Sequence, residues 1–346
     1  MKTGYEMGGA LSTVMLSIVV PTYNRAQLLN GLLESVVQDF DQWPEDLELI
    51  VSDNASPDET GAVIRGFLQR GYPISYIVNE TNIGADGNIA ASFDLARGKY
   101  LWVIGDDEVM YRGTVEYVLA LCRTENFGLL HLSSSGFVQG QQNSVCTREK
   151  PDMVKIESVS SRKLFRLTNI FLTFISANVV NRALIKDRFR NFDAYAELNS
   201  SLSQLSWTFK ALEACEIHYY VSTPLFGALA NNSGGYKLIE VFGINLIAIT
   251  KKYLQGVIPN AERIMTNAIV TRFLPREILS QMISEHKNEF ENENIAEITT
   301  SCFKENLYFQ LFLKPMLSGS ETKTKKAFHR IRVLDKMNRR LGYALL

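Results

Sequence analysis

This sequence of 346 residues lacks several features that would assign it to a class at once. Its four cysteines are widely spaced, with no CxxC pair and no neighbouring histidine, so we expect reduced thiols and no zinc site. No apolar run reaches the roughly 18 residues of a membrane span, and the N-terminus lacks the pattern of a signal peptide. The net charge of −1 gives no global electrostatic reason to expect a nucleic-acid partner. We therefore expect a cytoplasmic globular protein.

The first third of the sequence alternates between two kinds of pattern. Short β-branched or aromatic runs predict strands, and apolar residues at helical spacing between them predict helices. Such alternation implies right-handed crossovers and a mostly parallel central sheet flanked by helices, an α/β fold. The predicted strands cover residues 16–20, 47–51, 74–78, 100–104 and 127–132.

Composition suggests how the chain is divided. The polar, glycine-containing stretch 133–152 predicts a loop and the first boundary. We assign residues 1–14 to a flexible lead, 15–135 to a first α/β half, 136–235 to a second half of the same domain, and 236–346 to a helical C-terminal region with a basic end. In the second half, residues 175–180 and 217–221 predict strands. The positions predicted to share one helix face are Leu198, Leu202, Leu205, Phe209 and Leu212.

Polar turns follow the first four predicted strands, at residues 22–25, 52–54, 82–88 and 106–108. In a doubly wound sheet these turns share one edge, so we expect them to line one cleft. The adjacent carboxylates of Asp106 and Asp107 repel each other unless a cation such as Mg²⁺ or Mn²⁺ lies between them. Each turn also has a structural explanation, since Asp53 and Asn54 could simply cap a helix. Convergence of the four turns favours a binding site.

Four motifs together resemble the family 2 glycosyltransferases of the GT-A fold. They are LSIVVPTYNR at 16–25, VSDNAS at 51–56, NIG at 82–84 and GDD at 105–107. The resemblance is good over residues 15–123 and fades after Gly136. It is strongest with bacterial transferases of surface polysaccharides, including the abequosyltransferase-like branch. A dinucleotide fold is disfavoured because no Gly-x-Gly-x-x-Gly follows the first strand, and a Walker loop is absent too.

The resemblance implies a donor site for a nucleotide-sugar. Asp53 would accept a hydrogen bond from the base, and Asp86 would lie near the base or the ribose. Asp106 and Asp107 would serve the ribose and a divalent ion, Mn²⁺ or Mg²⁺, and which of the two acids binds the metal stays open. The residues predicted to border the nucleotide also include Pro21, Thr22, Tyr23, Asn24 and Asn54.

The group that would activate the acceptor is harder to find. Inverting transfer needs a base for the acceptor hydroxyl, and in the family an acid precedes a helix that contains a tryptophan. Trp207 matches that tryptophan, but the corresponding positions near Leu202 and Ser203 hold no acid. Glu197 and then Asp193 are the nearest candidates. Either the base has moved to one of them, or the domain binds without catalysing.

Three functions follow from these expectations. The leading hypothesis is inverting, metal-dependent transfer of a sugar to a glycan or lipid-linked acceptor in bacterial surface polysaccharide synthesis. The alternative is a non-catalytic nucleotide-sugar-binding or scaffold protein of an assembly complex. A nucleotidyltransferase is weaker, because no arginine- and lysine-rich activating loop is evident near residues 22–25.

The C-terminal end predicts one further partner. Apolar residues, among them Ile331 and Met337, punctuate basic ones at helical spacing, which suits a peripheral contact with an anionic membrane, although a solvated terminal helix fits as well. Such a contact would lie on the inner face of the plasma membrane, and the oligomeric state stays open. The basic residues are Lys323, Lys325, Lys326, Arg330, Arg332, Lys336, Arg339 and Arg340.

Overall fold

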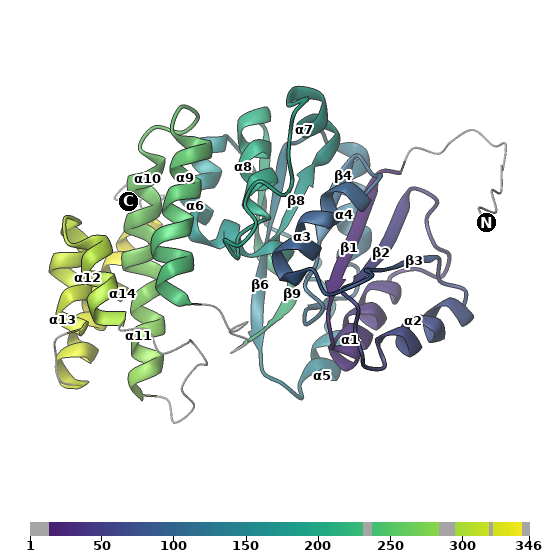
Figure 1. Ribbon diagram of the computed structural model, residues 1–346, viewed down its shortest axis with the longest axis horizontal. Coiled ribbons are helices and arrows are strands. Elements are labelled where there is room, and N and C mark those ends of the chain that lie inside the picture. The colour runs from purple at the N-terminus through teal and green to yellow at the C-terminus, as the bar shows by residue number, and fades with distance from the viewer. Residues whose placement is uncertain (1–13, 231–236, 284–294, 318–320, 341–346) are drawn as a thin grey trace.

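The computed structural model describes residues 14–230, 237–283, 295–317 and 321–340 (Figure 1). The predicted lead lies outside these residues except for Val14. A mixed sheet occupies one end of the molecule and a helical region the other. Its strand order is β3-β2-β1-β4-β8-β6-β9-β5, with β7 paired to β9.

The strands confirm the predicted α/β class and add elements that the sequence did not reveal. The two-residue β5 and the exposed β7 were not predicted, because neither is long enough or apolar enough to stand out. The nine strands in the described part of the chain are β1 (Leu16–Thr22), β2 (Leu47–Asp53), β3 (Ile74–Val78), β4 (Tyr100–Val103), β5 (Val109–Met110), β6 (Leu129–Phe137), β7 (Ile156–Val159), β8 (Asn178–Asn181) and β9 (His218–Leu229).

Strands β1 to β4 form the parallel half of the sheet. β1 lies between β2 and β4, and β3 pairs with the outer side of β2, all in parallel register. The carboxyl ends of the four strands therefore point to one edge, as the strand and helix alternation predicts. β8 then enters antiparallel between β4 and β6, and β9 runs parallel to β6.

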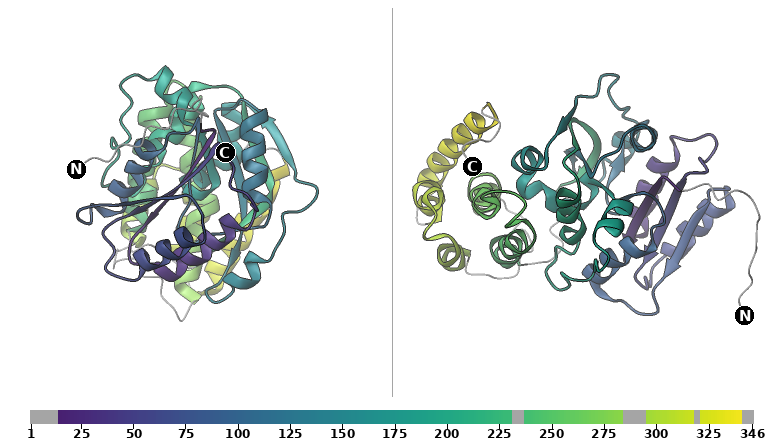
Figure 2. Two further views of the ribbon diagram at one scale, coloured as in Figure 1. Left: turned by 90° about the vertical axis from the view of Figure 1, so that its right-hand side faces the viewer. Right: turned by 90° about the horizontal axis from the view of Figure 1, so that it is seen from above.

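Helices cover both faces of the sheet (Figures 1 and 2). One core cluster joins alternate residues of β1, β2 and β4 to α1, α2 and α4, and a second joins the opposite residues to α3, α6 and α8. Two-sided burial explains why these strands read as nearly continuous apolar runs. The bounds are α1 (Ala26–Val37), α2 (Thr60–Gln69), α3 (Gly84–Leu95), α4 (Thr114–Thr124), α5 (Gln142–Cys146), α6 (Ser161–Thr168), α7 (Arg182–Arg188) and α8 (Leu205–Ala214).

Two predictions for the second half of the sheet were wrong. The polar stretch 133–152 is not a loop throughout, because β6 continues to Phe137 and α5 follows. The boundary after residue 135 therefore lies inside a strand that pairs with β8 and β9, so the two halves share one sheet. The helix expected from Leu198 begins at Leu205. Its predicted first turn is interrupted by Asn199 and Ser201, whose φ angles of 64° and 60° no right-handed helix can contain.

The C-terminal region is helical, as predicted. Its core is continuous with the α8 side of the sheet through Leu246, Ile264 and Ile331. None of the described helices is both long and apolar enough to span a lipid bilayer. The helices are α9 (Leu246–Leu254), α10 (Ala261–Ala268), α11 (Leu274–Ile283), α12 (Ile295–Phe303), α13 (Lys314–Leu317) and α14 (Glu321–Arg340), with π-helical segments at Glu240–Asn245, Ile269–Phe273 and Phe309–Leu313.

Candidate functional site

The four polar turns meet at one edge of the sheet. The amide of Asn54 donates to the carbonyl of Thr22, and the amide of Asn79 donates to the carbonyl of Asp53, with N···O distances of 2.9 Å. Beyond β4, the amide of Ile104 donates to the carbonyl of Val19 at 3.0 Å. Parallel pairing thus continues past the ends of the strands and aligns the turns side by side. This is the convergence that the sequence predicts.

Asp106 is the centre of the contacts between the first and fourth turns. Its Oδ2 accepts a hydrogen bond of 2.7 Å from the Thr22 hydroxyl, and its Oδ1 lies 3.1 Å from the Arg25 guanidinium. The same guanidinium nitrogen lies 3.6 Å from Oδ2 of Asp107. Arg25 therefore neutralises part of the charge of two neighbouring carboxylates. Sequence reasoning placed Arg25 in the first turn but gave it no role, because its partners are about 80 residues away.

Burial controls the electrostatics of this acidic turn. Desolvation raises the pKa of Asp106 to about 6, against the opposing charge of Arg25, and the charge of Asp107 adds to the increase. Burial also raises the pKa of Glu108 well above its ordinary value. Glu108 Oε1 accepts from the Ser176 hydroxyl at 3.4 Å, whereas its Oε2 is buried with no hydrogen-bond partner among the described residues. A further cation at this turn would stabilise the ionised carboxylates.

Asp53 is buried at the end of β2 and is held on both oxygens. Oδ1 accepts from the amide of Ser56 at 2.9 Å, and Oδ2 accepts from the Tyr76 hydroxyl at 2.5 Å. Tyr76, on β3, was not predicted as part of the site. A carboxylate oxygen can accept more than one hydrogen bond, so Asp53 keeps acceptor capacity for a ligand.

Asn54 ties the second turn to the third. Its Oδ1 accepts from Asn79 Nδ2 and from the amide of Ile83, and its Nδ2 donates to Asn82 Oδ1 and to the Gly84 carbonyl. These four bonds use the full capacity of the amide, so the described geometry gives Asn54 a structural role. It therefore does not offer a free group to a nucleotide.

Asn88 reinforces the same junction from α3. Its Oδ1 accepts from the Ser52 hydroxyl at 2.7 Å and its Nδ2 donates to the Ser52 carbonyl at 2.9 Å. Asn88 also accepts from Asn79 Nδ2 at 3.2 Å. The sequence placed Asn88 at the end of the predicted third turn, 82–88, but gave its side chain no role.

The first turn presents side chains to solvent. Pro21, next to last in β1, is partly buried, Tyr23 is 44% exposed, and Asn24 is exposed. Asn24 has a φ of 54°, and its amide donates to the Ser56 hydroxyl at 2.8 Å. A short polar side chain tolerates this backbone conformation best. The turn thus holds an exposed aromatic ring beside the Thr22 and Asp106 pair.

Asp86 connects α3 with the loop that precedes α8. Its carboxylate Oδ2 accepts a hydrogen bond of 2.8 Å from the amide of Ser201. Ser201 belongs to the 197–204 loop, which precedes α8 and carries the two positive φ angles. Asp86 lies in the first turn of α3, where the helix dipole favours a carboxylate. The structure therefore brings one predicted donor-site residue into contact with the second half of the chain.

The two candidate bases have different surroundings. Glu197 is 9% exposed, and its Oε1 lies 2.5 Å from the Lys252 ammonium of α9. Asp193 is exposed and accepts a hydrogen bond of 2.9 Å from the amide of Tyr195. Of the two, Glu197 belongs to the loop whose Ser201 amide reaches Asp86.

The positions where the family carries an acid are apolar or fully buried here. Leu202 is 2% exposed and Ser203 is buried completely. The Gln204 side chain donates to the Thr173 carbonyl at 2.6 Å. Trp207 stacks on Phe93 of α3 with ring centroids 5.7 Å apart, which fixes α8 against α3. The chain therefore has the tryptophan expected in α8 but no carboxylate at the positions just before that helix.

The acidic turn fits a divalent ion only in part. Asp106 and Asp107 supply hard oxygen ligands of the kind that Mg²⁺ and Mn²⁺ prefer. Within the described ranges, no group of three or more His, Cys, Asp and Glu side chains could hold a metal ion. Two carboxylates leave most of an octahedral shell to other donors, and a ligand with phosphate oxygens would supply them.

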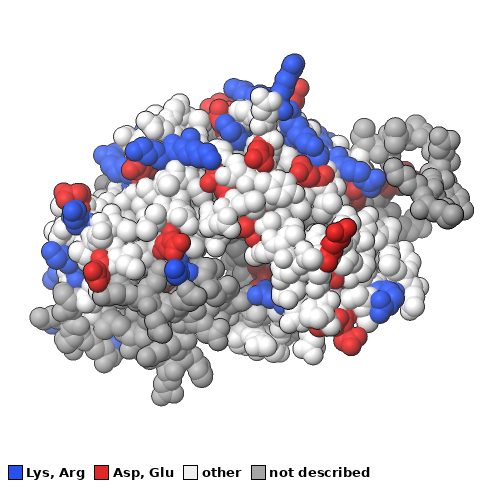
Figure 3. All heavy atoms as spheres, in the orientation of Figure 1, with Lys and Arg blue, Asp and Glu red and all other residues white. Residues whose placement is uncertain are grey.

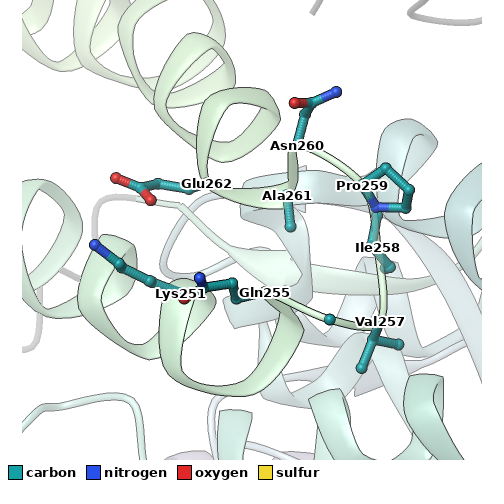
Figure 4. A pocket seen from close by; sticks show the side chains of 9 residues that line it. Lys251, Gln255, Val257, Ile258, Pro259, Asn260, Ala261 and Glu262 are labelled. Atoms are coloured by element: carbon teal, nitrogen blue, oxygen red, sulfur yellow. The ribbon is translucent and has the colours of Figure 1, made fainter.

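Surface and cavity features outside the turns do not add to the site. Figure 3 shows acidic and basic side chains intermixed over one face, with basic ones rising at the upper edge near α7. A cavity of about 470 Å³ lies between α9 and α10 and is lined by residues 251 and 255–262 (Figure 4). None of its lining residues belongs to the four turns.

Comparisons with known proteins agree on one family. Residues 17–148 match the family described as glycosyl transferase family 2. Abequosyltransferase RfbV of Salmonella typhimurium is 36% identical over 103 residues, which are 30% of this chain and 31% of that protein. The GalNAc(5)-diNAcBac-PP-undecaprenol beta-1,3-glucosyltransferase of Campylobacter jejuni is 29% identical over 182 residues, 52% of this chain and 56% of that protein. The matches thus span about a third to about a half of these relatives.

Similarity in three dimensions extends over nearly the whole chain. The structure of S. aureus TarS 1–349 in complex with UDP-GlcNAc aligns with a TM-score of 0.58 and 18% identity, covering 94% of this chain and 92% of that one. Identity at this level shows the fold, and the predicted GT-A fold is confirmed.

Proposed function

Since residues 17–148 form a glycosyl transferase family 2 domain within a GT-A fold, we propose that this protein transfers a sugar from a nucleotide-sugar to a glycan or lipid-linked acceptor in bacterial surface polysaccharide synthesis. The observation that carries the proposal is the cluster of Thr22, Arg25, Asp106 and Asp107 at the carboxyl edge of the sheet. This edge is where open α/β sheets bind ligands.

The donor would lie across the four turns. Tyr23 and Asn24 are exposed beside the first strand and would border the nucleotide together with Pro21 and Thr22. Asp53 retains acceptor capacity for a base N–H, and Asp86 would lie near the base or ribose. Asn54 would act indirectly, by holding the second and third turns in position.

Asp106 and Asp107 would hold the ribose and a divalent ion, Mn²⁺ or Mg²⁺. The ion would neutralise charge on the departing diphosphate. Because the protein offers few ligands of its own, we expect the metal to bind well only together with the diphosphate. Arg25 pairs with both carboxylates and neutralises part of their negative charge.

In the proposed reaction the acceptor oxygen forms a bond to the anomeric carbon on the face opposite the diphosphate. The bond from that carbon to the diphosphate oxygen breaks, and its electron pair leaves with the nucleoside diphosphate. The acceptor proton passes to a carboxylate, for which Glu197 is the first candidate and Asp193 the second. Configuration at the anomeric carbon is inverted.

The relatives support the kind of acceptor. One carries undecaprenol in its name and another is an abequosyltransferase, so a lipid-linked or oligosaccharide acceptor is consistent with both. We therefore propose that the protein works in the cytoplasm at the inner face of the plasma membrane. The identity of the sugar and of the acceptor is left to experiment.

The first experiment is a thermal-stability screen of nucleotide-sugars with and without Mn²⁺ or Mg²⁺, since a ligand that binds only the folded state raises the melting temperature. With the donor so identified, Asp107→Ala should abolish turnover and metal-dependent nucleotide binding together, and Asp41→Ala, an exposed acid outside the turns, should change neither. Near-normal turnover by the Asp107 variant would refute the assignment.

A non-catalytic nucleotide-sugar-binding or scaffold protein is the second candidate. It is favoured by the absence of a carboxylate at Leu202 and Ser203 and by the ion pair that engages Glu197. Transfer to any acceptor, or hydrolysis of any donor, would exclude this function. Tight, metal-dependent nucleotide binding without product would support it.

A further inference from the structure

The last described helix, α14, has one face buried and the other open. Thr324, Ala327, Ile331 and Asn338 are buried against the core of the helical region, and α14 contacts α11 and α13. Seen from above in Figure 2, α14 lies at the end of the molecule away from β1 to β4. Its opposite face is therefore not covered by the described parts of the fold.

That open face is strongly basic. The exposed basic residues form two adjacent rows opposite the buried side chains, one of Lys325, His329, Arg332 and Lys336 and the other of Lys326 and Arg330. The only acid between residues 324 and 338 is Asp335, which is 12% exposed and turned toward Arg272, 3.5 Å away. The exposed basic residues are Lys325, Lys326, His329, Arg330, Arg332 and Lys336.

These charges stand out against the rest of the molecule. The chain as a whole has a net charge of −1, so the positive face is a local feature of α14. Within the described residues, no carboxylate lies within ion-pair distance of Lys326, Arg330, Arg332 or Lys336. Attraction between these four cations and an anionic surface is therefore not offset by an ion pair with any described carboxylate.

Apolar side chains lie between the cations. Val333 is 48% exposed and Met337 is 51% exposed, on the same side as Arg330 and Lys336. A helix with cations flanking exposed apolar side chains suits the boundary between lipid headgroups and acyl chains. An open depression of about 440 Å³ lined by Lys325, Lys326, His329 and Arg330 gives phosphate groups a place among the charges.

We propose that the open face of α14 binds an anionic phospholipid surface, with Lys326, Arg330, Arg332 and Lys336 facing the headgroups. Nucleic acid fits this face less well. Phe328, the only aromatic residue between positions 324 and 338, is half-buried, so the face offers no exposed ring for stacking on bases. The inference concerns where the protein acts, and it holds whether or not sugar transfer is the reaction.

The experiment measures binding of the full chain to sedimented vesicles of phosphatidylglycerol and phosphatidylcholine. A quadruple variant carries Lys326→Gln, Arg330→Gln, Arg332→Gln and Lys336→Gln. Each cation near an anionic bilayer is worth roughly a fivefold change in partitioning, so four should weaken binding by roughly several hundredfold. Wild-type binding should also fall steeply as salt rises.

A second quadruple variant is the matched control. It neutralises four exposed cations on other elements and changes the net charge by the same amount: Lys155→Gln, Lys186→Gln, Arg190→Gln and Arg263→Gln. It should bind vesicles like the wild type. Equal melting temperatures and equal donor binding in solution would show that both variants are folded and that the test is separate from the transfer reaction.

Three results would overturn the proposal. The first is unchanged binding by the α14 variant, and the second is equal wild-type binding to pure phosphatidylcholine. The third is tighter binding to a single-stranded RNA than to the anionic vesicles under the same salt conditions.

Discussion

The first half of the sheet and the loop that precedes α8 meet at Asp86, but they are held in different ways. Asn54, Asn79 and Asn88 pin the second and third turns to each other through side-chain hydrogen bonds, and the Asn24 amide joins the first turn to the Ser56 hydroxyl. The 197–204 loop depends on two residues with positive φ and on an ion pair to α9. The proposed donor side is thus built within one α/β unit, whereas the loop that carries Glu197 relies on the C-terminal helices for its position.

The largest expected effect tests whether the loop contributes to chemistry. If Glu197 takes the acceptor proton, Glu197→Gln should lower kcat by about 10²-fold or more, because the amide cannot accept that proton. Steady-state kinetics with the donor found by screening would measure it.

Lys252→Met is the informative companion, since it breaks the same ion pair and keeps the carboxylate. It should retain most of the activity and lose some stability. Equal losses of kcat in both variants would mean that the ion pair only supports the loop, and Asp193→Asn would then be the next test.

The second effect probes the rigidity of the donor side. Asn54→Ala leaves the Ile83 amide and the Asn79 side chain without their acceptor, so the free energy of unfolding should fall by about 2–4 kcal/mol. Urea denaturation would measure the loss. Asn191→Ala, at an exposed position, should stay within about 0.5 kcal/mol of the wild type. If Asn54→Ala also stayed within about 0.5 kcal/mol of the wild type, the description of the turns as pinned by Asn54 would be contradicted.

The smallest effect is a pH dependence of kcat/KM that arises from Asp106, in the first half of the sheet. With the pKa of Asp106 at about 6, kcat/KM should fall about tenfold for each pH unit below 6, if the ionised carboxylate binds the donor. A profile that stays flat between pH 5 and 7 would contradict this role.

Stability should change in the opposite sense. The folded-state pKa lies above the ordinary value of about 3.9, so the protonated carboxyl contributes stability that is full below pH 4 and lost as pH rises through 6. Asp106→Asn should remove this part of the pH dependence, as measured by unfolding at several pH values.

The convergence of the four turns could be predicted from sequence because its signals are local. Apolar runs mark β1 to β4, and a polar turn directly follows each, so parallel topology alone brings Thr22, Asp53 and Asp106 together. The pairing of Arg25 with both aspartates could not be foreseen, because it depends on the rotamer of a long side chain. The prediction that Asn54 borders the nucleotide also came from its position in the second turn. It did not take account of the four hydrogen bonds that its side chain makes to Asn79, Asn82, Ile83 and Gly84.

The second half resisted prediction for a physical reason. Helical spacing is kept by Leu198, Leu202 and Leu205. A helix cannot pass through this stretch, however, because the φ angles of Asn199 and Ser201 are positive. Those angles are stabilised by contacts such as Asp86 with the Ser201 amide, across 115 positions. The spacing of apolar residues in a short segment cannot predict a contact between residues so far apart in the sequence.

The hydrogen bond from the Ser201 amide to Asp86 also has a consequence for the order of events during turnover. If the donor binds Asp86 in a way that draws Oδ2 from that amide, occupancy of the nucleotide site and the conformation of the 197–204 loop share one equilibrium. Linkage then requires reciprocity, in that whatever the donor does to the loop, an acceptor that fixes the loop does to donor affinity by the same factor. One backbone hydrogen bond would thus suffice to couple the binding of the donor to the binding of the acceptor before the reaction.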